Sequence, residues 1–258
     1  MTEGHARHVQ TQFGTIAQAY VESAGHAGGE DLEMLVAWGR ALRPRCVLDV
    51  ATGGGHTALA FAGVAPRVVA YDLTEPMLAA ARAFVSGRGA RSVAFVAGDV
   101  EALPFRAEAF DVVTCRIAAH HFANPARAVR QIASVLRPGG SFLLQDILGH
   151  DDAAANAFIL EVERRRDPSH VRSYRAAEWK AFLRAAGLTI MDEAVVAKTR
   201  PWEDWTGRTR MTPAAKNALE EFVRATPEAT RRAFEFVLDG ERVRSFADRM
   251  ILIRADRD

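Results

Sequence analysis

Residues 46–60, CVLDVATGGGHTALA, decide the fold of this chain. A short apolar run with one acid leads into a glycine cluster and then into sequence rich in alanine. Gly53, Gly54 and Gly55 carry no Cβ, so the backbone can turn sharply there and a ligand can approach it closely. Amide groups at the start of the following helix point into the same space. The stretch predicts a buried strand over 46–50, a tight turn, and a helix from about residue 55.

Two ligands suit a glycine turn of this kind, a dinucleotide and S-adenosylmethionine. The run GGGHTA satisfies the dinucleotide pattern G-x-G-x-x-A, and Asp72 follows about 20 residues on, as that pattern requires. S-adenosylmethionine instead carries an ammonium group and a sulfonium cation. Asp49, at the end of the strand, would face an anionic pyrophosphate unfavourably but would suit a cationic amino acid. Asp49 therefore favours S-adenosylmethionine.

Composition narrows the class of protein and its partners. The chain has 258 residues, 49% of them hydrophobic, which is ample for one core. The net charge of +1, from 33 basic and 32 acidic residues, predicts neither nucleic acid nor an anionic membrane as partner. No apolar run approaches a membrane span or a signal peptide, so we expect a cytoplasmic protein. Cys46 and Cys115 both fall in expected buried strands, which favours packed thiols over a disulfide.

Strands and helices alternate along the first 150 residues. After the glycine turn, short apolar runs predict strands over 67–72, 92–97, 110–115 and 141–145. The alternation predicts a doubly wound, mostly parallel α/β sheet. The regular alternation of strands and helices ends near residue 148. Beyond it we expect helices over 153–166 and 176–186, and the last two strands over 188–198 and 245–254.

We expect one domain over residues 1–258 with two lid segments. Residues 1–30 form the N-terminal lid, in which Phe13 and Tyr20 share the spacing of one helix face. Residues 200–240 form a helical insertion. From it, we expect Trp202, Trp205, Arg208 and Met211 to line an acceptor pocket. The arginines at 164–166 are expected on a solvated helix face, and binding of a substrate carboxylate is the alternative.

Acidic residues end four of the five expected parallel strands. They are Asp49, Asp72, Asp99 and Asp146, and the fourth strand ends at Cys115. In open α/β sheets, ligands bind beyond the carboxyl ends of the strands. Asp72 can accept both hydroxyls of a ribose, and Asp99 is placed to accept from an adenine amino group. One such aspartate is usually a turn residue, but four together predict a binding site.

The runs VLDVATGGG, VAYDLTEPML, GDVEALPF, FDVVTCRIAAHHF and LRPGGSFLL resemble the small-molecule class I methyltransferases related to the ubiquinone/menaquinone methylases. The resemblance covers about residues 9–150, including the F-x-x-x-A-x-x-Y pattern that ends at Tyr20. The later runs DPSHVR, EDWTGR and RSF resemble one uncharacterised bacterial branch of that group. The chain departs from the motif D-x-G-x-G-x-G of the family at one position, where Ala51 replaces the first glycine.

This resemblance implies a Rossmann-like sheet of seven strands in the order 3-2-1-4-5-7-6, with strand 7 antiparallel. It also implies S-adenosylmethionine as the methyl donor. The methionine end would lie at Asp49 and Gly53, the ribose at Asp72, and the adenine at Asp99 and Val100. The full set of expected cofactor contacts is Tyr20, Asp49, Ala51, Gly53, Gly55, Asp72, Leu73, Asp99, Val100 and Cys115.

Two histidines are the candidates for catalysis. Methyl transfer is an in-line displacement that gains much from positioning, and it needs a base only when the acceptor must lose a proton. His120 and His121 follow the fourth strand, and a histidine can take such a proton near neutral pH. Asp146, at the end of the next strand, can orient the imidazole. We take His121 ahead of His120; a purely structural role is the alternative for both. The spacing of ligating residues predicts no zinc site.

Two other functions stay open. A NAD-dependent oxidoreductase could use the same glycine turn, although Asp49 and Asp99 argue against it. A catalytically silent cofactor-binding protein would keep the same strand-end acids. The sequence is compatible with O-, N- or C-methylation of a small molecule and with a monomer or a homodimer.

Overall fold

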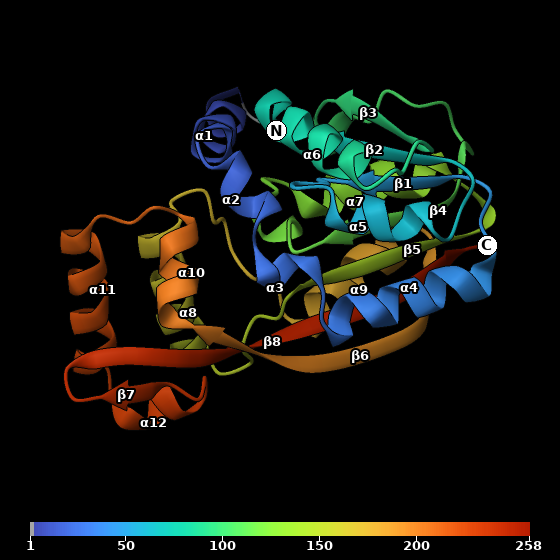
Figure 1. The fold of residues 1–258 in the computed structure, drawn as a ribbon. Helices are drawn as coiled ribbons and strands as arrows, with labels where there is room; N and C mark the ends of the chain where they lie inside the picture. The colour runs from blue at the N-terminus through green and yellow to red at the C-terminus, as the bar shows by residue number, and fades with distance from the viewer. Residues whose placement is uncertain (1–2) are drawn as a thin grey trace.

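The computed structural model describes residues 3–258, without the side chains of residues 3, 24 and 26. Within this range eight strands form one sheet, with seven of them in the order β3-β2-β1-β4-β5-β8-β6 (Figure 1). The strands are β1 (Val47–Val50), β2 (Val68–Asp72), β3 (Val93–Ala97), β4 (Phe110–Arg116), β5 (Leu136–Ile147), β6 (Leu188–Pro201), β7 (Val237–Asp239) and β8 (Arg242–Arg257).

The expected strand order is confirmed, with β8 in the place of strand 7. Strands β1 to β5 pair with one another in parallel, whereas β8 is antiparallel to both β5 and β6. The short strand β7 pairs with β8 outside the main path, and it lies inside the expected helical insertion.

Helices cover both faces of the sheet, which explains why the central strands β1 and β4 are buried along almost their whole length. On one face, α4 (Glu30–Leu42) and α5 (His56–Ala62) bury Leu35 and Phe61 against the strands. On the other, α7 (Pro125–Val135) and α9 (Ala176–Ala185) bury Ile132 and Trp179. The sheet is therefore doubly wound, as its alternating sequence predicts.

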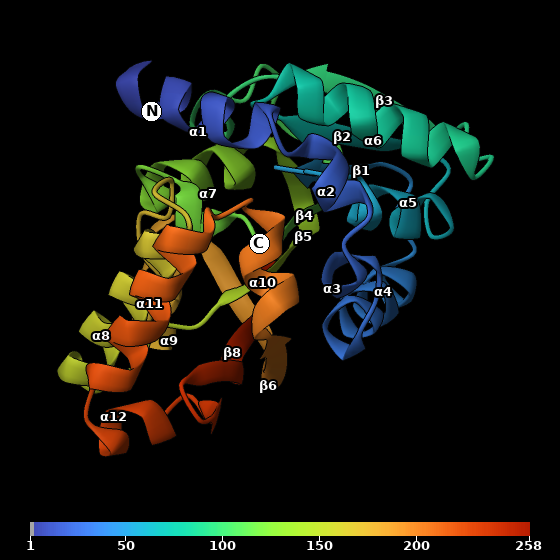
Figure 2. The ribbon, with the colours of Figure 1, turned by 60° about the vertical axis from the view of Figure 1, so that its left-hand side comes forward.

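The N-terminal helices pack beside α6 (Glu75–Gly87). They are α1 (Glu3–Gly14), α2 (Ala17–Val21) and α3 (Ala24–Ala27). Val9, Phe13 and Ile16 are buried against Met77 of α6, and Figure 2 shows α1 and α2 beside that helix. Residues 1 and 2 of the expected lid lie outside the described residues.

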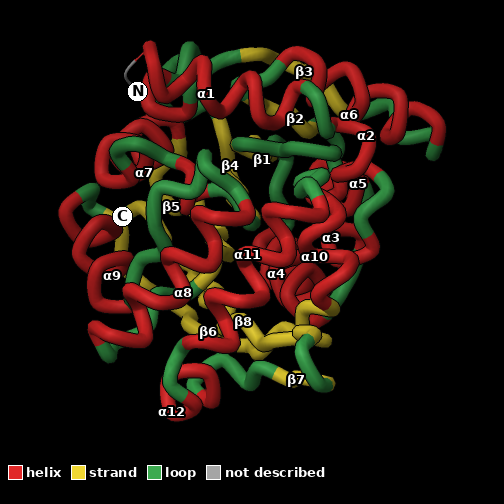
Figure 3. Tube along the Cα trace, turned by 90° about the vertical axis from the view of Figure 1, so that its left-hand side faces the viewer, coloured by secondary structure: helices red, strands yellow, loops and turns green. Residues whose placement is uncertain are grey.

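The insertion builds a hydrophobic cluster of its own with α8 (Ala153–Arg166). Its helices are α10 (Trp202–Arg208), α11 (Pro213–Ala225) and α12 (Glu228–Arg232). The cluster includes Phe158, Trp202 and Phe246. In Figure 1 the long strands β6 and β8 continue past the rest of the sheet to reach it. Figure 3 looks at the molecule from the side of the insertion and shows α1 near the top of the view and α8 and α11 lower down.

No helix of the described chain is long and apolar enough to cross a membrane.

Candidate active site

A cavity lies at the carboxyl ends of the parallel strands, between the N-terminal helices and the insertion. The strand ends and their turns supply one side of its wall, through Ala51, Thr52, Gly53, Asp72, Leu73, Asp99, Val100 and Arg116. Val9, Phe13 and Tyr20 line it from the N-terminal helices. The cavity thus lies at the edge of the sheet where the strand-end aspartates predict a binding site.

The glycine turn forms the part of the wall that a ligand can approach most closely. Gly53 has a φ of 54°, and a Cβ built on it would meet no atom within 4 Å. Its N–H donates to Oδ2 of Asp72 at 2.8 Å. Gly54 faces the other way, because a Cβ there would lie 3.0 Å from the backbone of Tyr20. The turn thus opens toward the cavity and packs against the N-terminal helices.

Asp72 is held in place by the backbone. Besides the bond from Gly53, its Oδ1 accepts from the N–H of Thr74 at 2.9 Å. Burial raises the pKa of Asp72, and the hydrogen bonds from the backbone work against that rise. The residue also lines the cavity, where a ligand can reach it. Asp99 is fixed in a similar way, since its Oδ1 accepts from the N–H of Glu101 at 2.8 Å.

Three of the expected cofactor residues do not line the cavity. Asp49 is 1% exposed, and its two oxygens accept from the hydroxyls of Thr52 and Thr114 at 2.6 and 2.7 Å. Burial raises the pKa of Asp49 to about 6. The carboxyl group is bonded to Thr52 of the turn and does not line the cavity, so its expected contact with the methionine end stays a prediction. Gly55 packs against α6, and Cys115 is fully buried in the sheet.

His120 forms a buried pair with Asp146. His120 Nδ1 and Asp146 Oδ1 are 2.6 Å apart, and the same oxygen accepts from the N–H of Ile147 at 2.9 Å. Burial lowers the pKa of His120 well below its usual range and raises the pKa of Asp146 to about 7. His120 lines the cavity, and its Nε2 makes no hydrogen bond within residues 3–258. With a proton on Nδ1, the imidazole presents a free lone pair on Nε2.

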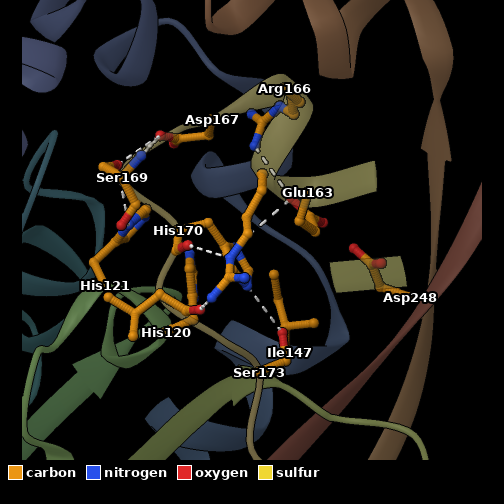
Figure 4. A network of polar contacts seen from close by, with 12 residues as sticks. His120, His121, Ile147, Glu163, Arg166, Asp167, Ser169, His170, Ser173 and Asp248 are labelled. Atoms are coloured by element: carbon orange, nitrogen blue, oxygen red, sulfur yellow. Dashed lines mark hydrogen bonds and ion pairs between the residues drawn. The ribbon is translucent and has the colours of Figure 1, made fainter. Parts of the chain in front are cut away.

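His121 also lines the cavity, but its surroundings differ. Its Nδ1 lies 3.1 Å from the carbonyl oxygen and 3.2 Å from Oγ of Ser169, and its ring packs edge-on against Phe13. His120, and not His121, is therefore the histidine that contacts Asp146. Figure 4 shows both rings together with His170, which stacks on His120 at 4.8 Å between ring centres.

The far wall of the cavity comes from segments that the sequence did not connect. It includes Glu163, Arg166, Arg200, Trp205, Arg208 and Asp248. Trp205 and Arg208 were expected there, whereas Trp202 and Met211 pack in the hydrophobic cluster of the insertion. Arg166 was expected in solvent, but its side chain is only 10% exposed. Arg200 and Asp248 gave no signal in the sequence, since nothing local marks residues that meet through the tertiary fold, and His170 stood out only as part of the run DPSHVR. The described residues contain no cluster of three or more metal-ligating side chains.

Comparison with known proteins agrees with this geometry. A family model described as a methyltransferase domain matches residues 48–144. The uncharacterised methyltransferase YcgJ of Bacillus subtilis is 38% identical over 183 residues, which are 71% of this chain and 72% of YcgJ. A ubiquinone biosynthesis O-methyltransferase of Xanthomonas axonopodis is 32% identical over 171 residues, 64% of this chain and 70% of its own length.

Solved structures give the same result over more of the chain. The crystal structure of a Bacillus halodurans protein described as a methyltransferase superposes with a TM-score of 0.85 at 42% identity, over 89% of this chain and 99% of its own. YcgJ superposes with a TM-score of 0.84 at 32% identity, over 88% of this chain and 97% of its own. The chain belongs to the class I S-adenosylmethionine-dependent methyltransferases. The relatives do not favour an oxidoreductase or a silent binding protein.

Proposed function

We propose that this chain transfers a methyl group from S-adenosylmethionine to a hydroxyl group of a small molecule, with His120 as the general base. The observation that carries the proposal is the pairing of His120 with Asp146 in the cavity that also holds Gly53 and Asp72. Methyl transfer follows from the family; the cofactor contacts, the base and the kind of acceptor are inferred from the residues.

The residues on the strand side fit S-adenosylmethionine. The open space over Gly53 leaves room for the methionine end, and Tyr20 closes that space from α2. Asp72 has acceptor capacity for both ribose hydroxyls. Leu73 and Val100 offer apolar surface to the adenine ring, and Asp99 offers an acceptor for its amino group. When bound, the cofactor supplies an electrophilic methyl group on a sulfonium.

The residues on the opposite side fit an acceptor that must lose a proton. Nε2 of His120 takes the proton of the acceptor hydroxyl, and Asp146 holds the imidazole through Nδ1 and stabilises the imidazolium that forms. A positioned base of this kind contributes about 10²–10⁴-fold to a rate. Walls from the N-terminal helices and the insertion exclude water, which strengthens these electrostatic interactions. The enclosed cavity and the balanced charge of the chain support a small molecule as acceptor.

Calorimetry with S-adenosylhomocysteine and NAD tests the cofactor assignment. We expect S-adenosylhomocysteine to bind and NAD to fail. Asp72→Ala should weaken binding by about 1.5–3 kcal/mol, the scale of hydrogen bonds to a charged group. Gly53→Val should also weaken it, by placing a side chain where the ligand approaches. Asp151→Ala removes an exposed carboxylate and is the matched control, with unchanged affinity. Binding of NAD alone, or full affinity in a folded Asp72→Ala protein, would contradict the assignment.

A further inference from the structure

Three arginines converge on the far wall of the cavity from three different elements. Arg166 ends α8, Arg200 lies near the end of β6, and Arg208 ends α10. All three line the cavity, and the side chains of Arg166 and Arg200 are 10% and 6% exposed. Trp205 lies among them, since the guanidinium of Arg166 stacks over its ring at 4.6 Å. The chain therefore concentrates cationic groups in a nearly closed space.

The three guanidinium groups are not equally paired. Arg200 donates to Asp248 at 2.7 Å, and Arg166 lies 3.7 Å from Oε2 of Glu163. Arg208 has no carboxylate within ion-pair distance among residues 3–258; its Nη1 donates to the hydroxyl of Ser23 at 3.1 Å. Its Nε is buried without a hydrogen-bond partner, and so is Oε1 of Glu163. Arg116, at the strand side of the cavity, differs because it is ion-paired with the buried Asp31 at 2.7 Å.

The cluster therefore carries more positive than negative charge. Against three guanidinium groups stand the carboxyl groups of Glu163 and Asp248 on the cavity wall and that of the buried Asp167 next to Arg166. Burial raises the pKa of Glu163 to about 8, so this group adds little negative charge near neutral pH. Burial, followed by repulsion from Arg166 and Arg200, lowers the pKa of Arg208 to about 10. Arg208 is half-buried, and its buried, unused Nε–H is costly; a ligand that brings an anion would relieve that cost.

A carboxylate is the anion that suits the site best. Guanidinium groups bind carboxylates through parallel N–H···O bonds, with geometric specificity as well as energy. Trp205, Ile147 and Phe122 also line the cavity and offer apolar and aromatic surface to the body of a ligand. A ligand held at both ends would present one group to the base and one to the arginines.

We propose that the methyl acceptor is a hydroxy acid, whose carboxylate binds at Arg208 and Arg166 while its hydroxyl lies at Nε2 of His120. This assignment rests on the proposed function, since it takes the cavity as a methyltransferase site. In the transfer, the acceptor oxygen forms its bond to the methyl carbon as the carbon–sulfur bond breaks, and the proton of the hydroxyl goes to His120. The carboxylate keeps its charge throughout and serves only to orient the acceptor.

The cofactor brings a second carboxylate, at its methionine end, so the experiment must separate the two. The enzyme is saturated with S-adenosylhomocysteine, and calorimetry then measures the binding of hydroxybenzoic, hydroxyphenylacetic and hydroxycinnamic acids. Each acid is compared with its own carboxamide. Labelled methyl transfer from S-adenosylmethionine is measured on the same compounds. The variant is Arg208→Gln, and the matched control is Arg210→Gln, an exposed arginine two residues away with the same change of charge.

We expect at least one acid to bind about tenfold or more tightly than its amide and to accept the methyl group. Arg208→Gln should remove that preference while S-adenosylhomocysteine binds within about twofold of the parent, and Arg210→Gln should behave as the parent. Equal binding of acids and amides, or binding of neither, would contradict the proposal. A loss of S-adenosylhomocysteine affinity in Arg208→Gln would assign the arginine to the cofactor instead. Failure of the parent protein to bind S-adenosylhomocysteine at all would count against the proposed function.

Discussion

His120 can act as a base only while its Nε2 is unprotonated, and its surroundings favour that state. The ring is buried, it stacks on His170, and it lies beside His121, so a second proton would add charge to a crowded apolar site. Asp146 fixes the ring through Nδ1. His120 follows β4 and Asp146 lies near the end of the neighbouring strand β5. Because both positions are at strand ends, the sequence alone predicted that the two side chains meet.

Replacement of each histidine separates the two candidates. His120→Ala should lower kcat by about a hundredfold or more, because the acceptor hydroxyl loses its base. Asp146→Asn should cost less, since it removes orientation and charge stabilisation but leaves the imidazole. His121→Ala should cost least, because no carboxylate orients that ring. Single-turnover rates, with S-adenosylhomocysteine affinity as the control for folding, check the order. A full rate in His120→Ala would leave positioning alone as the source of catalysis.

The pH dependence of kcat/KM follows from the same pKa shift. A base must be deprotonated to act, and burial lowers the pKa of His120. The rate should therefore rise with pH through a limb that lies below the ordinary histidine value of about 6.5, and should be level above it. This limb should disappear from the residual activity of His120→Ala. A limb above pH 7 in the parent would mean that another group controls the reaction.

At the scale of elements, the glycine turn contains a strained alanine. Ala51 has a φ of 51°, in the left-handed region that glycine adopts without cost. The sequence showed that Ala51 replaces a glycine of the family motif. It did not show that the backbone at Ala51 keeps the left-handed conformation that glycine favours. In the same element, the pattern gave the position of Asp49 but not its partners, Thr52 and Thr114.

Ala51→Gly should therefore stabilise the protein. Relief of the left-handed conformation is worth about 1–2 kcal/mol, and the greater freedom of glycine in the unfolded chain offsets about 0.4–1 kcal/mol of it. Denaturant unfolding should give a free energy about 0.5–1 kcal/mol above that of the parent. Ala79→Gly, at an exposed position of α6, is the control and should destabilise by a similar amount. Destabilisation by both variants would show that the turn is not strained.

The N-terminal helices form the element most open to change on binding. They are short, and their apolar face packs on α6 and against the turn through Tyr20. We expect bound S-adenosylhomocysteine to slow amide hydrogen exchange over residues 10–24, because the ligand fills the space that these helices cover. Helix α9, far along the chain and outside the cavity wall, is the internal control and should not change. Equal exchange over 10–24 in the two states would rule out a lid.

At the scale of the whole molecule, the sequence predicted the parts that local patterns determine. The strand order followed from a family resemblance over residues 9–150, and the edge of the sheet that carries the cavity followed from the alternation of strands and helices. The start of β5 at Leu136 was missed, because Pro138 and two glycines read as a helix end alone. The short strand β7 was missed within a helical stretch. The far wall was predictable only at Trp205 and Arg208, because α8, β6, α10 and β8 meet only when the insertion folds back on the sheet.

A crystal structure of the S-adenosylhomocysteine complex tests the proposed positions of the cofactor and the base most directly. We predict that the ribose hydroxyls bind Asp72 and that the adenine lies between Leu73 and Val100. The sulfur should face Nε2 of His120 across a space that one small molecule can fill. We also predict that Arg208 stays free of the cofactor carboxylate. A cofactor that lies away from Asp72, or whose sulfur faces away from His120, would contradict the proposed positions.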